Sequence, residues 1–484
     1  MSEPILPVLP APRVVVEVLD RFVDPLAALA ACRDAHHAVL LHSGPVDHPS
    51  ARWSILATDP VLVASLRGLE ATLLFPGGMP PRVERRSLRD PFEFLRALAP
   101  AGAVRSATEG LPFCGGAIGY LGYGLRRSVE SLPAKPPDPL GHPDAWFGLY
   151  DAAVLFDHRE RRTLVLATGL GAKDETERGA RAAARLRHMR ALLDGAGREP
   201  PAPAPPPGGV RAAALSEADY LPRVRRALAY IAAGDVYQVN LSHRITCPIP
   251  GDPRDLFLRL ARANPAPFAA YLDAGPFQVV CSSPERLVSL RGDRARSSPI
   301  KGTRPRGLTP EEDAVLARAL AASAKDRAEN VMIADLVRND LGRVCVSGGV
   351  EVETLCGVES FATVHHLVST VTGRLRPGAD RIDLLRALFP GGSMTGAPKV
   401  RAMEVIDELE GEERGIYSGS LGYLSFDGGM DFNIVIRTIL CDGGTASLRV
   451  GGGIVADSDP RGEYQETLDK ARALLAALGA GPVR

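Results

Sequence analysis

The chain has 484 residues, of which 45% are hydrophobic and 24% charged, as is typical of a globular protein with a sizeable core. Lysine plus arginine and aspartate plus glutamate number 57 each, and no long run of like charge occurs, so we expect no nucleic-acid partner. No apolar run is long enough to cross a bilayer, and we expect no membrane partner either.

The cysteines and the N-terminus indicate the cellular compartment. The seven cysteines are scattered, and none belongs to a Cys-x-x-Cys pair. Their odd number and their spacing are typical of free thiols in a reducing environment. The first residues, MSEPILPVLPAPRVVVEVLDRF, lack the cationic stretch followed by an apolar core that a secretory signal has. We therefore expect a cytoplasmic protein.

The first part of the chain mixes strand and helix patterns. Apolar, β-rich runs at 38–43 and 163–170 predict strands, and the pattern at 175–195 predicts a long helix. The proline-rich stretch that follows favours an extended, unpaired chain. We therefore predict an N-terminal region, a linker and a second region, at 1–195, 196–210 and 211–484.

The second region alternates helical patterns with short apolar runs. Helices are predicted at 220–233, 311–340 and 461–479. Strands are predicted at 237–247, 413–426, 432–441 and 446–456. This alternation predicts an α+β fold of large, mostly antiparallel β-sheets with helices packed outside them.

Two of the predicted helices carry carboxylates along one face. Glu329 shares a face with Asp326, and Glu463 shares a face with Glu466 and Lys470, because helical residues three and four apart are neighbours. Both faces are compatible with a charged, solvated helix surface. The alternative is a Mg²⁺ site that bridges an anionic ligand, which the three consecutive glycines just before the second helix favour.

A glycine-rich turn at 391–396 precedes a helix expected from Pro398. The turn lacks the Gly-Lys-Ser/Thr ending of a nucleotide phosphate loop, so we exclude a P-loop. Its N–H groups and the positive end of the helix suit a carboxylate, and a purely structural turn is the alternative.

Three further side chains are ambiguous. His365 and His366 point to opposite faces of a β-like run and cannot ligate one metal, so His366 is a candidate for the core or for substrate contact. Glu285 is compatible with a surface carboxylate. Lys301, in the stretch SSPIKGTRPRG, is either a solvated cation beside two arginines or a buried amine that attacks a substrate.

A series of motifs runs from about Tyr220 to Leu478: GDVYQVNLS, SSPERL, PIKGTRPRG, KDRAENVMIADLVRNDLGRVC, HHLVST, FPGGSMTGAPKVRAMEVIDELE, GSLGYLSFDGGMD, GGGIVADS and EYQETLDKA. Together they resemble the chorismate-utilising enzymes, the family that includes the first components of anthranilate synthase and of aminodeoxychorismate synthase. The resemblance implies two packed, roughly orthogonal antiparallel β-sheets flanked by helices. It also implies that the region 211–484 is the chorismate-binding catalytic domain.

By motif match, the resemblance implies a Mg²⁺ ion held by Glu329 and Glu466, with Glu463 nearby. The implied contacts of chorismate are Gln238, Thr303, His366, Thr395, Tyr417, Arg437, Gly451, Gly452, Gly453 and Lys470. The guanidinium of Arg437 suits bidentate pairing with a carboxylate.

Two positions separate the reactions within the family. Isochorismate and salicylate synthases resemble one another in having a lysine where this chain has Gln238, which argues against water as the nucleophile. Anthranilate synthases typically have a small residue where this chain has Lys301, and a lysine is the pattern of aminodeoxychorismate synthases. Arg304 and Arg306, beside this lysine, are expected to be solvated.

The resemblance therefore implies a covalent route. Lys301, neutral because burial depresses its pKa, attacks C2 of chorismate while Glu285 protonates the departing C4 hydroxyl. Ammonia then gives 4-amino-4-deoxychorismate, the precursor of p-aminobenzoate and folate.

The ammonia source and a second ligand pocket are also implied by the resemblance. The chain has no Gly-x-Cys-x-Gly nucleophile turn, so a separate glutamine amidotransferase subunit is expected to supply ammonia. Relatives bind tryptophan in a pocket whose candidate positions here are Ser43, Pro265 and Phe268, with His42 in place of the usual glutamate. The alternative functions are the first component of anthranilate synthase and a non-catalytic ligand-binding subunit.

Overall fold

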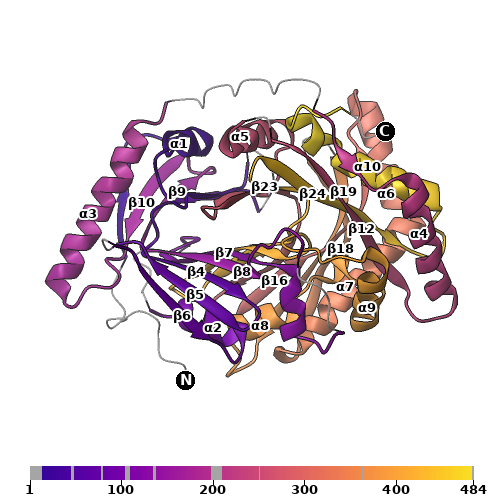
Figure 1. The fold of residues 1–484 in the computed structure, drawn as a ribbon, viewed down its shortest axis with the longest axis horizontal. Coiled ribbons are helices and arrows are strands. Elements are labelled where there is room, and N and C mark those ends of the chain that lie inside the picture. Colours follow the sequence, from indigo (N-terminus) through magenta and orange to yellow (C-terminus); the bar gives the residue numbers. More distant parts are fainter. Residues whose placement is uncertain are drawn as a thin grey trace.

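The computed structural model describes residues 14–44, 48, 50–77, 80–103, 110–133, 138–197, 210–249, 251–361 and 364–481. Within them the strands form two 12-stranded sheets, I and II, whose strands pair in antiparallel fashion. Figure 1 shows the two sheets as layers, with α1, α5 and α10 on one outer side and α2 and α8 on the other. The predicted α+β fold with two antiparallel sheets and flanking helices is confirmed. Most of the predicted linker lies outside the described residues.

Sheet I contains, in spatial order, β1 (Val15–Val18), β10 (Arg162–Ala167), β9 (Ala152–Asp157), β3 (Trp53–Ala57), β2 (Val39–His42), β13 (Phe268–Asp273), β14 (Phe277–Ser283), β23 (Thr438–Asp442), β24 (Thr445–Ile454), β12 (Gln238–Pro248) and β11 (Ala213–Ala214). The short strand β20 (Gly396–Ala397) also pairs with β12.

Sheet II contains, in spatial order, β17 (Ile300–Pro305), β19 (Val364–Leu375), β16 (Arg294–Ser298), β15 (Arg286–Arg291), β22 (Met430–Asn433), β21 (Ser420–Ser425), β7 (Gly116–Leu121), β8 (Ala145–Tyr150), β4 (Leu62–Arg67), β5 (Glu70–Phe75) and β6 (Arg82–Ser87). The long strand β18 (Cys345–Ser360) pairs with β19.

Both sheets are continuous across the two predicted regions of the chain. In sheet I, β2 pairs with β13, and in sheet II, β7 pairs with β21. The first region therefore extends the same two sheets that carry the candidate site.

The helices are α1 (Pro25–Ala31), α2 (Pro91–Leu98), α3 (Glu175–Asp194), α4 (Glu217–Ala232), α5 (Pro253–Ala263), α6 (Pro310–Ala322), α7 (Ala324–Gly342), α8 (Arg381–Leu388), α9 (Lys399–Glu410) and α10 (Pro460–Ala477), with short 3₁₀ turns η1 (Tyr123–Ser128) and η2 (Gly392–Met394). None of the helices in the described part of the chain is long and apolar enough to cross a membrane.

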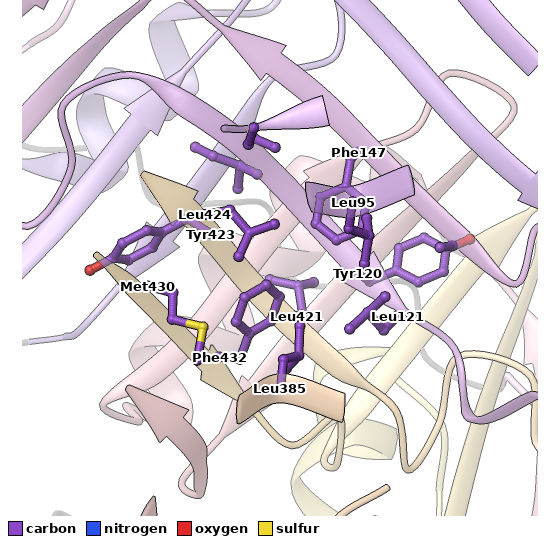
Figure 2. Packing of buried hydrophobic residues seen from close by; sticks show 14 of the residues in the cluster. Leu95, Tyr120, Leu121, Phe147, Leu385, Leu421, Tyr423, Leu424, Met430 and Phe432 are labelled. Carbon is purple, nitrogen blue, oxygen red and sulfur yellow. The ribbon is translucent and has the colours of Figure 1, made fainter. Parts of the chain in front are cut away.

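The largest hydrophobic core takes residues from both sheets and from the helices of sheet II. Figure 2 shows Leu385 of α8 near Leu421 and Phe432 of sheet II, and Leu95 of α2 near Phe147 and Tyr120 of the same sheet. A second core lies between sheet I and the helices α1, α3, α5 and α10. The free energy of burying these apolar side chains holds the sheets in one arrangement, so residues that face the space between them have fixed positions.

Three sequence predictions are corrected by the structure. The predicted strand at 432–441 is two strands, because the chain leaves sheet II after Asn433 and enters sheet I at Thr438. The predicted helix at 311–340 is two helices, and Ser323 ends α6 and caps the start of α7. The predicted strand at 413–426 is confined to β21. The break between β22 and β23 could not be predicted, because both strands are largely buried and the sequence between them is equally apolar.

Candidate active site

A β-bulge in β17 sets the direction of Lys301. Its register against β19 shifts between Lys301 and Thr303, and Gly302, in between, has a φ of 75°. A β-carbon at 302 would also lie 2.9 Å from Asp326 of α7, so only glycine fits there. The bulge directs Thr303 towards His366, with 3.0 Å between Thr303 Oγ1 and His366 Nδ1.

The amine of Lys301 lies among polar atoms of sheet I and of the glycine-rich turn. Its Nζ donates to the Ser393 carbonyl at 3.4 Å. A β-carbon at Gly453 would lie 3.3 Å from this Nζ and would collide with Nε2 of Gln238. Burial lowers the pKa of Lys301, opposed by the negative charge of Glu329. Lys301 is half-buried with its amine among polar atoms of the protein, so it is not the fully solvated cation of the first alternative.

Glu285 is buried, with 3% exposure, between β14 and β15. The N–H of Ile300 donates to its Oε1 at 3.3 Å. Burial raises the pKa of Glu285 to about 7, although the Ser393 hydroxyl and the positive charge of Lys301 oppose this shift. A carboxyl group that keeps its proton near neutral pH can act as a general acid. The surface interpretation of Glu285 is wrong.

The glycines of β24 bring the side chains of α10 together. A β-carbon at Gly452 would lie 3.1 Å from Glu463 Oε2 and 3.7 Å from both Glu466 Oε1 and Lys470 Nζ. Lys470 Nζ donates to the Gly451 carbonyl at 2.8 Å and forms an ion pair with Glu466 at 2.6 Å. Because Gly452 has no side chain, the carboxylates of Glu463 and Glu466 and the amine of Lys470 can lie close to β24.

The two α10 carboxylates have different environments. Glu463 is buried, accepts a hydrogen bond from Ser458 Oγ at 2.6 Å, and has a pKa raised by burial. Glu466 is more exposed, and the positive charge of Lys470 lowers its pKa. Glu329 of α7 is half-buried, and burial raises its pKa.

The carboxylates fit a Mg²⁺ ion that shares its coordination with a ligand. In the described part of the chain, no three acidic, histidine or cysteine side chains enclose a metal by themselves. Mg²⁺ commonly takes one or two protein carboxylates and fills its other positions with water and substrate oxygens. Glu463 and Glu466 both lie next to Gly452, and the charge of Glu466 acts on Glu329. These three carboxylates offer only oxygen ligands, which suits a Mg²⁺ ion that also binds water and substrate.

The remaining predicted contacts surround the same space. His366 is buried and neutral, since burial lowers its pKa to about 4. Thr395 is fully buried, and its hydroxyl makes only long contacts with Gly391 and Gly392 carbonyls at 3.4 and 3.3 Å. Tyr417 is buried, and burial raises the pKa of its phenol.

Arg437 joins β22 to β23 in an unusual conformation. Its φ is 52°, a left-handed value that is uncommon outside glycine, and its Nη1 donates to the Lys470 carbonyl at 2.8 Å. Its charge interacts with Glu466 and with Tyr417. A strained backbone that positions a half-buried arginine is typical of a binding site.

The two arginines after Lys301 pair with carboxylates of α6 and α7. Arg304 pairs with Asp326 at 2.8 Å and Arg306 with Asp313 at 2.7 Å, and each side chain is about one-third exposed. Arg304 and Arg306 are thus partly exposed and paired with carboxylates, whereas the sequence predicted that they are solvated.

Sequence reasoning missed two polar groups of the site. Ser393 and Asn240 are buried; the hydroxyl of Ser393 interacts with Glu285, and Asn240 Oδ1 has no hydrogen-bond partner among the described residues. Both atoms of the Gln238 amide are likewise unpaired. Unpaired buried polar atoms are costly, and a polar ligand that hydrogen-bonds to Asn240 and Gln238 would remove that cost. Ser393 and Asn240 lie inside recognised motifs, but their side-chain directions depend on the turn and on β12.

Two candidate tryptophan-pocket residues line a second cavity. Ser43 and Phe268 face a cavity of about 430 Å³ together with His42 and Trp53. Pro265 does not line this cavity and packs near Gly44, whereas Pro267 lines it. Burial lowers the pKa of His42 to about 3, and its Nε2 has no partner within the described chain.

All seven cysteines are free, as the sequence predicted, and the structure shows that all are buried. This agrees with the expected reducing compartment, and the cytoplasmic location stays a prediction.

Comparison with known proteins identifies the family. Residues 49–476 match the chorismate binding enzyme family. The chain is 42% identical to anthranilate synthase component 1 of Streptomyces coelicolor over 96% of this chain and 88% of that protein. It is also 42% identical to aminodeoxychorismate synthase component 1 of Salmonella typhimurium, over 91% of this chain and 93% of the relative.

A solved structure supports the same assignment. Anthranilate synthase component I from Streptococcus pneumoniae superposes with a TM-score of 0.76 and 34% identity, covering 88% of this chain and 93% of the other. The chain therefore belongs to the chorismate-binding enzyme family and is a chorismate-utilising enzyme. Overall identity does not distinguish an anthranilate synthase component from an aminodeoxychorismate synthase component, because this chain is 42% identical to a relative of each kind.

Proposed function

We propose that the chain is the chorismate-aminating component of an aminodeoxychorismate synthase. The observation that carries this proposal is the half-buried Lys301, whose amine has a lowered pKa, in the same site as Glu285, whose pKa is raised to about 7. A neutral amine and a protonated carboxyl are the two forms that the covalent route requires.

In the proposed route, Nζ of Lys301 forms a bond to C2 of chorismate while the C4–O bond breaks. The proton of Glu285 goes to the departing hydroxyl, which leaves as water. Ammonia then forms a bond to C4, the Nζ–C2 bond breaks, and the extra proton of the nitrogen returns to the site. The product is 4-amino-4-deoxychorismate, a precursor for p-aminobenzoate and folate synthesis.

Binding and orientation come from the side chains around this pair. Arg437, Lys470, Tyr417, His366, Thr303 and Thr395 would hold the carboxylates of chorismate, and Gln238 would contact the ring beside Lys301. Glu329, Glu463 and Glu466 would hold Mg²⁺, which when bound neutralises the ring carboxylate and draws electron density towards it. A separate glutamine amidotransferase subunit would supply ammonia.

The competing function is that of an anthranilate synthase component, which the 42% identity to the Streptomyces coelicolor relative favours. Incubation with chorismate, Mg²⁺ and ammonium separates the two. The proposal predicts a non-fluorescent product that a lyase converts to p-aminobenzoate. Fluorescent anthranilate as the sole product would refute it.

We also propose that the 430 Å³ cavity beside Ser43 and Phe268 binds a small ligand such as tryptophan. Its support is the enclosed polar atom His42 Nε2, which a ligand could satisfy. Calorimetric titration with tryptophan tests this, with a Ser43→Trp variant that fills the cavity as the comparison.

A further inference from the structure

Among the described strands, the strand that carries Lys301 has a partner on one side only. β17 lies at the end of sheet II and pairs with β19. Its other side contacts the helices α6 and α7. The bulge between Lys301 and Thr303 also interrupts the ladder with β19. Because a bulge leaves one residue unpaired, the conformation of β17 at this point depends on side chains of the neighbouring helices.

Asp326 of α7 contacts this bulge in two ways. Its Oδ2 pairs with Nη2 of Arg304 at 2.8 Å. A β-carbon at Gly302 would lie 2.9 Å from Cβ of Asp326, so the backbone of the bulge packs against this side chain. The same Arg304 donates from Nη1 to the Thr303 carbonyl at 2.8 Å. Asp326 therefore holds the chain on both sides of Thr303.

The helix α7 is itself fixed to β19 beside the bulge. Asn330, four residues after Asp326 and on the same helical face, is fully buried. Its Nδ2 donates to the Leu367 carbonyl at 2.9 Å. Leu367 is the residue of β19 that pairs with Lys301. The helix therefore contacts both strands at this point, β17 through Asp326 and β19 through Asn330.

The same helix carries Glu329, three residues after Asp326. Burial raises the pKa of Glu329, and the negative charge of Asp326 adds to this shift. The charge of Glu329 in turn acts on the amine of Lys301. A movement of β17 relative to α7 would therefore change the placement of Lys301 relative to Glu329, and Asp326 is the side chain that joins the two elements.

We propose that Asp326 is a positioning residue for Lys301. Through Gly302 and Arg304 it fixes the bulge of β17, and thereby the direction of the lysine side chain. The proposal rests on the proposed function, because it takes Lys301 as the reacting amine. The side chains of the ion pair are 16% exposed at Asp326 and 35% exposed at Arg304. Partly exposed ion pairs contribute little to folding stability, so removal of this pair should affect the reaction more than the fold.

Asp326→Ala removes both contacts with the bulge and tests the proposal. We expect kcat for amination to fall by about tenfold or more, because misplacement of a reacting group lowers the rate steeply. The equilibrium affinity for chorismate and the urea midpoint should stay close to wild type. Arg304→Gln should also lower kcat, whereas Arg304→Lys keeps the charge and should retain more activity. The matched control is Asp335→Ala, which removes an exposed carboxylate of the same helix that pairs with Arg338 and should leave kcat unchanged.

A double-mutant cycle with Lys301→Ala shows whether Asp326 acts through the lysine. Added to Lys301→Ala, Asp326→Ala should cause no further loss of the residual activity, because the effects of residues that act together are not additive. An equal loss in both backgrounds would overturn the proposal.

The proposal would also be overturned by an unchanged kcat in Asp326→Ala, or by a loss of chorismate affinity as large as the loss of kcat. These two measurements decide the matter if Lys301→Ala has no measurable activity. Full activity of Lys301→Ala alone is a different outcome, because it would refute the proposed function and, with it, any need to position the lysine.

Discussion

Gly453 and Gln238 occupy adjoining space, so that a methyl group on residue 453 would collide with the amide nitrogen of Gln238. The same methyl group would lie 3.3 Å from Nζ of Lys301. Gln238 and Lys301 therefore leave no space for a side chain at residue 453. Replacing this glycine with alanine should displace them.

Gly453→Ala should displace the Gln238 amide and the Lys301 amine while leaving the sheet intact. Misplacement by about 1 Å can lower a rate by about a hundredfold, so we expect kcat to fall by that order. Steady-state kinetics and the far-ultraviolet circular dichroism spectrum check this. Gly342→Ala is the control, because a β-carbon there meets nothing within 4 Å. Equal losses in the two variants would contradict the explanation.

Ser458→Ala should weaken Mg²⁺ binding through Glu463. The Ser458 hydroxyl donates to Glu463 Oε1 at 2.6 Å and fixes a carboxylate that we propose as a metal ligand. Loss of such an outer partner typically lowers metal affinity 10- to 100-fold, so roughly that shift is expected in the Mg²⁺ dependence of activity. The exposed Ser347→Ala variant is the comparison. An unshifted Mg²⁺ curve for Ser458→Ala would remove Glu463 from the metal site.

The raised pKa of Glu285 should make the folded state less stable as pH rises. The unfolded carboxyl ionises near its usual pKa of 4.5, whereas the folded one keeps its proton until about pH 7. Stability is therefore lost between these two pH values and is level above pH 7, with a total loss of about 3.5 kcal/mol at about 1.4 kcal/mol per unit.

Urea unfolding of wild type and Glu285→Gln from pH 4 to pH 8 measures this loss. The advantage of the variant in free energy of unfolding should grow up to about pH 7 and then stay constant, while its activity is lost. A difference that is independent of pH would show that Glu285 has an ordinary pKa in the folded protein.

Glu410→Gln should destabilise the protein strongly. Glu410 is buried and pairs with Arg414 at 2.7 Å and Arg449 at 3.0 Å, and both arginines are also buried. Removing one partner of a buried ion pair leaves uncompensated charge and costs about 3–5 kcal/mol. Chemical denaturation measures the loss, with the exposed Glu311→Gln as control. A loss no larger than that of the control would mean that the buried charges are compensated elsewhere.

The sequence could predict the fold class, because it depends on local patterns and ordered motifs, and the site residues that the motifs imply stay a prediction. It could not separate β22 from β23, since Ile434 and Val435 are as apolar as the strands around them and only the backbone at Arg437 reveals the change of sheet. It also could not predict the buried state of Glu285 or the unpaired amide oxygen of Asn240. Both depend on contacts between segments far apart in the chain.

The most direct test of the covalent route is the amination activity of Lys301→Ala beside its affinity for chorismate. With chorismate, Mg²⁺ and ammonium, the wild type should form 4-amino-4-deoxychorismate. The variant should lose most of this activity while equilibrium binding of chorismate stays measurable. Full amination by Lys301→Ala would contradict the account, because ammonia would then displace the hydroxyl without the lysine.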